Sequence, residues 1–185
     1  YAFLATPSGA KPRWMSEKYV EIRRVNAEGQ RELHGSRHNH CFSSPVYRQK
    51  VRTINARLAE RYRAHPALAG WHISNEYSGA CHCDLCLAAF RSWLEARYTT
   101  LDALNHAYWA AFWAQRFQSW EQIDPRGAPL DGLALDWDRF VTHQTLDFMK
   151  NEITPLRALT PDLPVTTNMM GTFAGLDYWR FTEVC

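Results

Sequence analysis

Four cysteines in this sequence have the types and spacing of a metal site. Cys81, Cys83 and Cys86 form a Cys-x-Cys-x2-Cys cluster, and Cys41 lies at the end of the long polar segment before it. Short loops of this kind bring sulfur atoms within reach of one ion, and four thiolates complete a tetrahedral shell around zinc. A shell that leaves no position for water or substrate is structural. The sequence therefore predicts a structural Zn2+ bound by these four residues.

Two alternatives for the cysteines stay open at this point. Disulfides are one, although pairing at such short spacings is geometrically awkward. A histidine ligand is the other: His82, His38 or His40 can replace one thiolate, so the fourth ligand is less certain than the first three. Cys185 lies apart from the cluster, and we expect it to be a thiol in the core.

A second chemical centre is predicted at Asn75 and Glu76, which end an apolar stretch at residues 68–74. That stretch has the length and composition of a short buried strand. In parallel α/β proteins, side chains at the carboxyl ends of strands point into a shared active-site mouth, where a carboxyl group can serve as general acid and base. A surface glutamate that only caps the following turn is the alternative.

The elements that must position these residues alternate along the chain. Strands are predicted at 1–6, 68–74 and 165–171. One helix is capped by Ser44 and ends before His65, a second begins near Asp84, and a third is capped by Thr100. A fourth runs through 137–153, with Pro155 expected to kink or split it. Segments 11–40 and 124–129 are predicted loops, and residue 183 falls in a further predicted helix.

This alternation predicts an α/β fold with parallel strands joined by right-handed crossovers. Three strands make an incomplete parallel sheet, because such a sheet needs both faces covered. We therefore expect the chain to be part of a larger protein. The first residue is Tyr1 rather than Met, so the location in the cell cannot be read from the N-terminus.

Composition excludes several classes of protein. A hydrophobic content of 46% is enough for a packed core. The 21 basic and 19 acidic residues are mixed along the chain, whereas nucleic-acid binding needs clustered Lys and Arg. No stretch approaches the roughly 20 apolar residues of a membrane helix. We therefore expect neither a nucleic acid nor a membrane as partner.

Several segments together resemble the β-galactosidases of glycoside hydrolase family 42. They are WHISNEY at 71–77, CHCDLC at 81–86, AFRSWL at 89–94, GSR at 35–37 leading to Cys41, LATP at 4–7 and VTTN at 165–168. The resemblance covers nearly the whole chain. The combination is specific, because the wider clan of retaining hydrolases shares the Asn-Glu pair but not this set of cysteines.

The resemblance implies a fold, a reaction and roles for single residues. The fold is a (β/α)8 TIM barrel, of which residues 1–185 supply about the third to fifth strands of the catalytic domain. The reaction is retaining hydrolysis of terminal β-galactosides. Glu76 corresponds to the acid/base, Asn75 to a residue that binds the sugar near its 2-hydroxyl, and Arg37 to a galactose ligand. Trp113 matches a pocket-lining aromatic more loosely, with core packing as the alternative. The four cysteines correspond to the metal ligands.

The resemblance also implies what this chain lacks. In relatives, the nucleophilic glutamate lies near the end of the seventh strand, and this sequence stops after the fifth. Glu183, in the predicted helix before a sixth strand, cannot take its place. We expect the 185-residue chain alone to be inactive, and the complete enzyme to be a cytoplasmic homo-oligomer, a trimer by analogy.

Two other functions remain alternatives from the sequence. One is a small zinc-ribbon-like module that binds nucleic acid or protein, with the glutamate incidental. The other is a retaining glycosidase of the same clan that acts on glucosides, mannosides or arabinosides.

Overall fold

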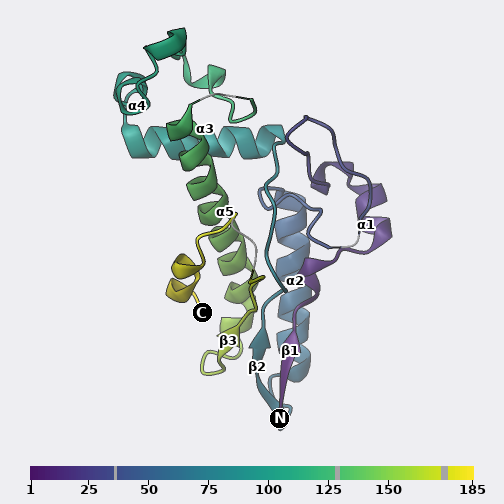
Figure 1. Ribbon diagram of the computed structural model, residues 1–185. Helices are drawn as coiled ribbons and strands as arrows, with labels where there is room; N and C mark the ends of the chain where they lie inside the picture. Colours follow the sequence, from purple (N-terminus) through teal and green to yellow (C-terminus); the bar gives the residue numbers. More distant parts are fainter. Residues whose placement is uncertain (36, 128–129, 172–174) are drawn as a thin grey trace.

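The core of the fold is a short parallel sheet in the order β1–β2–β3 (Figure 1). The computed structural model describes residues 1–35, 37–127, 130–171 and 175–185. β1 comprises Ala2–Ala5, β2 Leu68–His72 and β3 Val165–Thr166. Both neighbouring pairs are parallel, which confirms the α/β fold predicted from the alternation of elements.

β3 is shorter than predicted, because the strand beside it turns away. Ser74 and Glu76 have positive φ angles of 51° and 47°, so the chain after β2 leaves the ladder. Beyond the two strands, the segments that follow β2 and β3 stay in contact through single hydrogen bonds, such as the one from the Glu76 amide to the Asn168 carbonyl (3.2 Å).

The two faces of the sheet differ in their surroundings. Leu4, Trp71 and Val165 are partners in register, so they share the face that packs into the core. Phe3 and Gly70 are partners on the opposite face, where Phe3 is exposed. A Cβ atom on Gly70 would come within 2.5 Å of the Phe3 ring and 2.7 Å of a backbone oxygen, so this position requires glycine.

Two long helices pack against each other beside the sheet (Figure 1). α2 spans Pro45–Tyr62, and α5 spans Asp131–Arg157. The Ser44 hydroxyl caps α2 by accepting a hydrogen bond from the Tyr47 amide (3.2 Å), as predicted. Pro155 does not split α5, because it lies in the last turn, within two residues of the helix end. In the described ranges, no helix is both long and apolar enough to span a bilayer.

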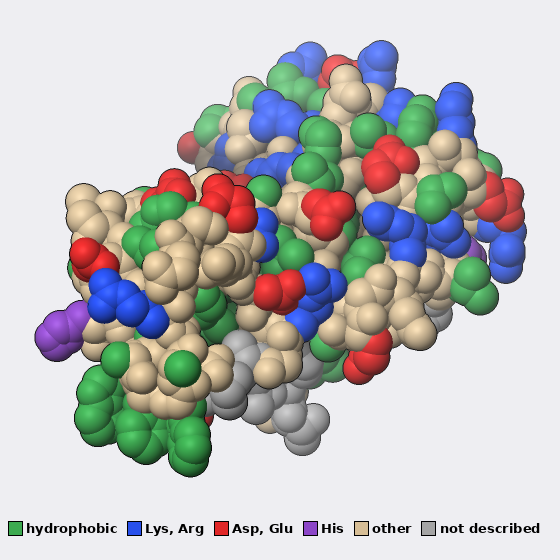
Figure 2. Space-filling model, turned by 90° about the horizontal axis from the view of Figure 1, so that it is seen from above, with side chains coloured by type: hydrophobic (Ala, Val, Ile, Leu, Met, Phe, Trp, Pro, Cys, Tyr) green, Lys and Arg blue, Asp and Glu red, His purple; other side chains and the backbone are tan. Residues whose placement is uncertain are grey.

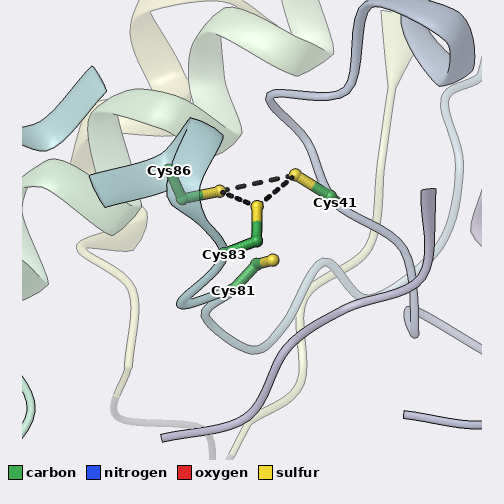
Figure 3. A group of neighbouring side chains, drawn as sticks. All are labelled: Cys41, Cys81, Cys83 and Cys86. Atoms are coloured by element: carbon green, nitrogen blue, oxygen red, sulfur yellow. Dashed lines mark hydrogen bonds between the residues drawn. The ribbon is translucent and has the colours of Figure 1, made fainter. Parts of the chain in front are cut away.

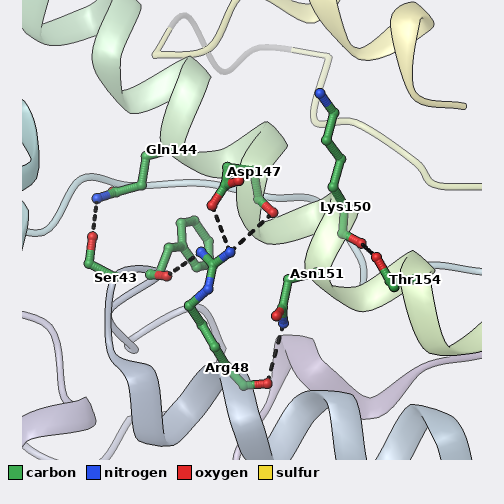
Figure 4. A network of polar contacts seen from close by, with 8 residues as sticks. Ser43, Arg48, Gln144, Asp147, Lys150, Asn151 and Thr154 are labelled. Carbon is green, nitrogen blue, oxygen red and sulfur yellow. Dashed lines mark hydrogen bonds and ion pairs between the residues drawn. The ribbon is translucent and has the colours of Figure 1, made fainter. Parts of the chain in front are cut away.

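A polar network joins these two helices (Figure 4). Arg48 of α2 donates to the Asp147 carboxylate (2.6 Å) and to the Phe42 carbonyl (3.1 Å). Asn151 of α5 donates to the Arg48 carbonyl (3.3 Å), and Gln144 donates to the Ser43 hydroxyl (2.6 Å). Because several groups share one cluster, the pairing fixes the relative position of α2 and α5 better than one isolated surface ion pair would.

α3 (Asp84–Tyr98) and α4 (Leu101–Ala107) lie across the upper end of α5 (Figure 1). The Thr100 hydroxyl caps α4 by accepting from the Ala103 amide (3.1 Å), as predicted. A buried carboxylate of α5, Asp136, accepts hydrogen bonds from the hydroxyls of Tyr98 (2.6 Å) and Tyr108 (2.9 Å). This carboxylate therefore holds α3 and the end of α4 on α5.

The predicted long loop contains more structure than the sequence indicated. It includes α1 (Arg13–Lys18) and the short 3-10 helix η2 (Val20–Ile22). Another short 3-10 helix, η1 (Pro7–Gly9), lies just before its start. Antiparallel bridges join Arg23 to His40 and Val25 to Arg31. Elements this short give no periodic signal, which is why the sequence did not reveal them.

Further short 3-10 helices are η3 (Phe112–Ala114), η4 (Trp120–Gln122) and η5 (Tyr178–Glu183). η5 contains the predicted helical position of Glu183. The prediction that Cys185 is a core thiol was wrong, because Cys185 is exposed. Residues 128 and 129 of the predicted loop 124–129 lie outside the described residues.

A second buried carboxyl group of α5 lies in the core near the sheet. Glu152 accepts hydrogen bonds from the hydroxyls of Ser8, after β1, and Tyr77, after β2. In the described part of the chain it has no ion pair with Lys or Arg. Burial therefore raises its pKa to about 8, with the Tyr77 hydrogen bond acting in the opposite direction.

This pKa predicts a pH-dependent stability. An unfolded glutamate releases its proton near pH 4.5, whereas folded Glu152 keeps it to about pH 8. The contribution of Glu152 to folding stability is thus fully present below pH 4.5 and is lost as the pH rises through about 8. Glu152→Gln cannot titrate, so we expect the stability of the wild-type protein to fall relative to this variant by a few kcal/mol between pH 4.5 and 8. Denaturant unfolding of both proteins across this range measures the difference, and parallel pH profiles would contradict the assignment.

Candidate active site and metal centre

The polar pair predicted at the end of β2 lies in a strongly bent turn. Asn75 and Glu76 are half-buried and follow Ser74. The Ser74 amide donates to the Thr6 hydroxyl (2.7 Å) after β1, and the Glu76 amide donates to the Asn168 carbonyl (3.2 Å) after β3. Hydrogen bonds to both neighbouring strand ends therefore support a backbone conformation that non-glycine residues rarely adopt.

Arg37 and Glu76 come together, although they lie 39 residues apart in the sequence. A guanidinium nitrogen of Arg37 donates to the Glu76 carboxylate at 2.8 Å. The arginine side chain is about half exposed, so this ion pair contributes little to folding stability. It leaves both charged groups accessible from solvent. Ser36, between Gly35 and Arg37 in the predicted motif, lies outside the described residues.

A hollow of 520 Å³ opens beside this pair at the carboxyl ends of β1 and β2. Arg37 and Asn75 line it, together with Phe3 and His72. The His72 ring nitrogen lies 3.1 Å from the side-chain oxygen of Asn168, so polar groups from two strands face the same space. An aromatic ring combined with a few convergent polar groups is the usual make-up of a small-molecule site.

The four predicted metal ligands form one buried cluster (Figure 3). The Cys41 sulfur lies 3.5 Å from that of Cys83 and 3.4 Å from that of Cys86, and all four sulfurs fall within 4.8 Å of one another. These separations are well beyond a disulfide bond of about 2 Å, and all four thiols are free. The disulfide alternative is therefore wrong for this structure.

Donors from outside the cluster reach two of its sulfurs, and the pKa is lowered for Cys81 and Cys83 but raised for Cys41 and Cys86. The Val25 amide donates to the Cys81 sulfur (3.4 Å), and the Gln144 side chain donates to the Cys86 sulfur (3.4 Å). Hydrogen bonds from Cys41 and its neighbours lower the pKa of the Cys83 thiol. Donors of this kind orient metal-ligating thiolates and tune their charge.

The histidines considered as substitute ligands are not part of this group. His82 stacks on Trp137 with ring centroids 4.8 Å apart, and His40 packs against Tyr47 at 4.2 Å. The sulfur cluster alone meets the geometry of a metal site among the described residues. Cys41 is accordingly the fourth member.

Comparison with known proteins identifies the family. The family model described as beta-galactosidase, that of glycoside hydrolase family 42, matches residues 1–185. The chain belongs to this family. Among curated relatives of family 42, it is 59% identical over 185 residues to beta-galactosidase BglY of Alicyclobacillus acidocaldarius, covering 98% of this chain. It is 56% identical over 191 residues to beta-galactosidase GanA of Bacillus subtilis.

Solved structures of beta-galactosidases have the same fold as this chain over nearly its whole length. The cold-adapted β-galactosidase of Rahnella sp. R3 superposes with a TM-score of 0.96 at 55% identity, covering 98% of this chain and 27% of that one. The β-galactosidase of Bacillus circulans sp. alkalophilus gives a TM-score of 0.95 at 42% identity, covering 99% and 29%. The chain spans 27% of BglY and 28% of GanA, so it corresponds to about a quarter of these relatives.

Trp113, the loosely matched family 42 aromatic, lies apart from the hollow. It is 80% exposed on η3, so core packing does not account for it. With Trp109 and Phe112 it forms a contiguous set of exposed rings. Hydrophobic side chains gather in this way at the lower left of Figure 2. The residues lining the hollow do not include Trp113, and its role in sugar binding stays a prediction.

The long polar segment contributes a set of buried basic residues, of which sequence reasoning named His38 and His40 only as possible metal ligands and did not name Lys11. Burial lowers the pKa of Lys11 to about 8, and its ammonium group donates to the Asn39 carbonyl (2.9 Å). Burial also lowers the pKa of His38 and, further, that of His40. All come from the long polar segment whose unusual length was the one available signal.

Arg24 connects the cysteine cluster with the loop that carries Glu76. Its guanidinium donates to the Ser78 carbonyl (2.8 Å) and lies in the field of the sulfurs of Cys81, Cys41 and Cys86. Gly79 makes this contact possible, because a Cβ atom there would overlap the guanidinium. The cysteine cluster and the loop that carries Glu76 are thus joined through one cation.

Substitutions at two glycines test the contact between Arg24 and the loop after Glu76. Gly79 and Gly127 both have positive φ, 77° and 68°, but among the described residues no atom lies within 4 Å of a Cβ built on Gly127. We expect Gly127→Ala to reduce the free energy of unfolding by about 1–2 kcal/mol from backbone strain alone. Gly79→Ala adds the displacement of Arg24, and we expect a further loss of about 1–3 kcal/mol. Denaturant unfolding measures both, and equal losses would show that the Arg24 contact contributes nothing.

Proposed function

We propose that this chain supplies the acid/base portion of a retaining β-galactosidase that hydrolyses terminal β-galactosides. The observation that carries the proposal is the placement of Glu76. Its carboxylate lies just after a parallel strand ends, 2.8 Å from the guanidinium of Arg37, which lines the hollow. Relatives that are more than half identical to the chain are named beta-galactosidases, which supports galactosides over the sugars of other glycosidases in the clan.

The proposed architecture is part of a (β/α)8 barrel, about its third to fifth strands. Parallel pairing in sequence order supports it, because consecutive strands of such a barrel are neighbours. The open sheet face that bears Phe3 and His72 would then face the barrel interior. In that arrangement, the whole of residues 1–185 belongs to one catalytic domain.

The proposed mechanism assigns each polar group a task. Retaining hydrolysis uses two carboxyl groups about 5–5.5 Å apart, one as nucleophile and the other as acid and then base. Glu76 protonates the leaving oxygen and afterwards takes a proton from water. Asn75 binds the sugar near its 2-hydroxyl, and Arg37 exchanges its ion pair with Glu76 for contacts to galactose hydroxyls. The nucleophile comes from a part of the protein outside this chain.

The cysteine cluster fits zinc by its donor set and burial. Cys41, Cys81, Cys83 and Cys86 offer four soft sulfur ligands at distances from one another that one ion can span. Zinc in a site of this composition supplies structural cross-linking rather than catalysis. Here it would tie the segment that ends at Cys41 to the loop after Glu76, so that both sides of the sugar site keep their positions.

The zinc-ribbon-like alternative loses its support. The chain folds around a parallel sheet crossed by long helices, and it belongs to a hydrolase family over its whole length. Its formal net charge of +2 also gives no support to a nucleic acid as partner.

Replacement of the acid/base carboxyl tests the proposed reaction. In the full-length protein, we expect Glu76→Ala to lower kcat/KM for aryl β-galactosides with poor leaving groups by about 10²–10⁴-fold, the usual contribution of proton donation. Substrates with strongly acidic phenols need no proton and should lose far less, and azide should restore turnover. Glu95→Ala, a change at an exposed glutamate of α3, serves as control. Undiminished activity of the Glu76 variant on every substrate would refute the proposal.

Loss of one ligand tests the metal site separately. We expect purified full-length Cys83→Ala to contain less than one zinc per chain and to lose several kcal/mol of stability, since binding of a structural metal contributes directly to folding. Cys185→Ala, at an exposed thiol outside the cluster, should keep both its zinc and its stability. Elemental analysis and thermal unfolding measure these quantities. A wild-type preparation that binds no zinc under reducing conditions would contradict the assignment.

A further inference from the structure

Tyr77, the residue after the proposed acid/base, anchors that loop in the core. Its side chain is fully buried, and its hydroxyl donates to the Glu152 carboxyl on α5. The other oxygen of the same carboxyl accepts from the Ser8 hydroxyl after β1. One carboxyl group therefore joins α5 to the loops that follow two neighbouring strands.

Tyr77 and Glu76 are adjacent in the turn but differ in their surroundings, because Tyr77 is fully buried and Glu76 is only half-buried. Tyr77 lies among Phe42 and Phe181, with ring centroids 6.2 Å away in each case, whereas the Glu76 carboxylate reaches Arg37 near the surface. Any rotation of the backbone that moves the Tyr77 hydroxyl also moves the Glu76 carboxylate. The buried hydrogen bond thus fixes the direction of the exposed group.

The strained backbone gives this hydrogen bond its importance. Ser74 and Glu76 have positive φ, which costs non-glycine residues about 1–2 kcal/mol each. Amide hydrogen bonds to Thr6 and Asn168 hold the turn from the side of the sheet. The Tyr77 side chain holds it from the side of α5, and a loop released there has a lower-energy conformation to relax into.

The surroundings of Glu152 argue against a purely structural role. A buried carboxyl without a cation is costly, and an apolar residue of similar size would fill the core at a lower cost. Asp136, the other buried carboxylate of α5, has Arg139 at 2.9 Å in addition to two tyrosines. Glu152 is bound by hydroxyl groups, and one of these belongs to the residue next to Glu76.

We propose that Glu152 is a positioning residue for the acid/base Glu76 and that it acts through the Tyr77 hydroxyl. The inference rests on the proposed function, because it requires Glu76 to be the proton donor. Glu152 itself touches neither substrate nor reacting atoms. Its effect on the reaction is confined to the steps in which Glu76 transfers a proton.

The test uses Tyr77→Phe in the full-length enzyme, with kcat/KM measured for aryl β-galactosides of graded leaving-group pKa. This quantity reports the step in which the leaving oxygen is protonated. A displaced donor should cost about 10- to 100-fold on phenyl galactoside, in line with the effect of a misplacement of about 1 Å. On dinitrophenyl galactoside, which needs no proton, the loss should stay within about threefold. Glu152→Gln should likewise lower kcat/KM more on phenyl galactoside than on dinitrophenyl galactoside.

Tyr108→Phe is the matched control. It removes a buried tyrosine hydroxyl that donates to a carboxylate of the same helix, 2.9 Å from Asp136. Asp136 lies 16 residues from Glu152, about 24 Å along the axis of α5. This variant should lose stability without any dependence on the leaving group.

The outcomes separate this inference from the proposed function. A flat loss across leaving groups in both Tyr77→Phe and Glu152→Gln, like that of Tyr108→Phe, overturns the positioning role. If Glu76→Ala shows a strong leaving-group dependence in the same series, the proposed function stands and only the positioning role fails. If Glu76→Ala also shows none, the proposed function fails. Should Tyr77→Phe not fold, the result for Glu152→Gln decides alone.

Discussion

The structure depends on one backbone constraint, the bent turn after β2. Positive φ at Ser74 and Glu76 takes the chain out of the sheet and brings the Glu76 carboxylate to Arg37, which lines the hollow. A turn of this kind persists only when its surroundings determine it from several sides. Here the Thr6 hydroxyl, the Asn168 carbonyl and the Glu152 carboxyl do so, each from a different element. The parallel order of the strands is what brings these elements to one place.

The cysteine cluster constrains the same turn from its far end. Cys81, Cys83 and Cys86 begin five residues after Glu76, and Cys41 follows Arg37 by four. Both partners of the ion pair therefore lie within a few residues of the cluster. A metal ion held by the cluster would cross-link the two loops beside Arg37 and Glu76, while the cluster itself is buried and does not line the hollow. This separation is expected of a structural site, because four sulfur ligands would fill the coordination shell of an ion and leave no position for substrate.

Local features were predictable from the sequence, and long-range ones were not. The caps at Ser44 and Thr100 were predicted correctly because each depends on a hydrogen bond to an amide three residues away. The cysteine group followed from spacing, since three of its members are nearly adjacent. The end of β3 was missed because the turn of a neighbouring strand determines it. Arg24 and Glu152 were also missed, because their partners lie 54 and 75 or more residues away and neither has a distinctive motif.

The two buried carboxyl groups of α5 differ in their partners. Asp136 is surrounded by tyrosine hydroxyls and by Arg139, so its charge is balanced and its hydrogen bonds hold α3 and α4 in place. Glu152 meets hydroxyl groups in the core, and burial raises its pKa to about 8. A carboxyl that is neutral at lower pH can remain in the core without a cation, whose field would otherwise act on Glu76, the proposed acid/base. The hydroxyl partners of Glu152 thus allow it to hold the loop while leaving Arg37 as the cation paired with Glu76.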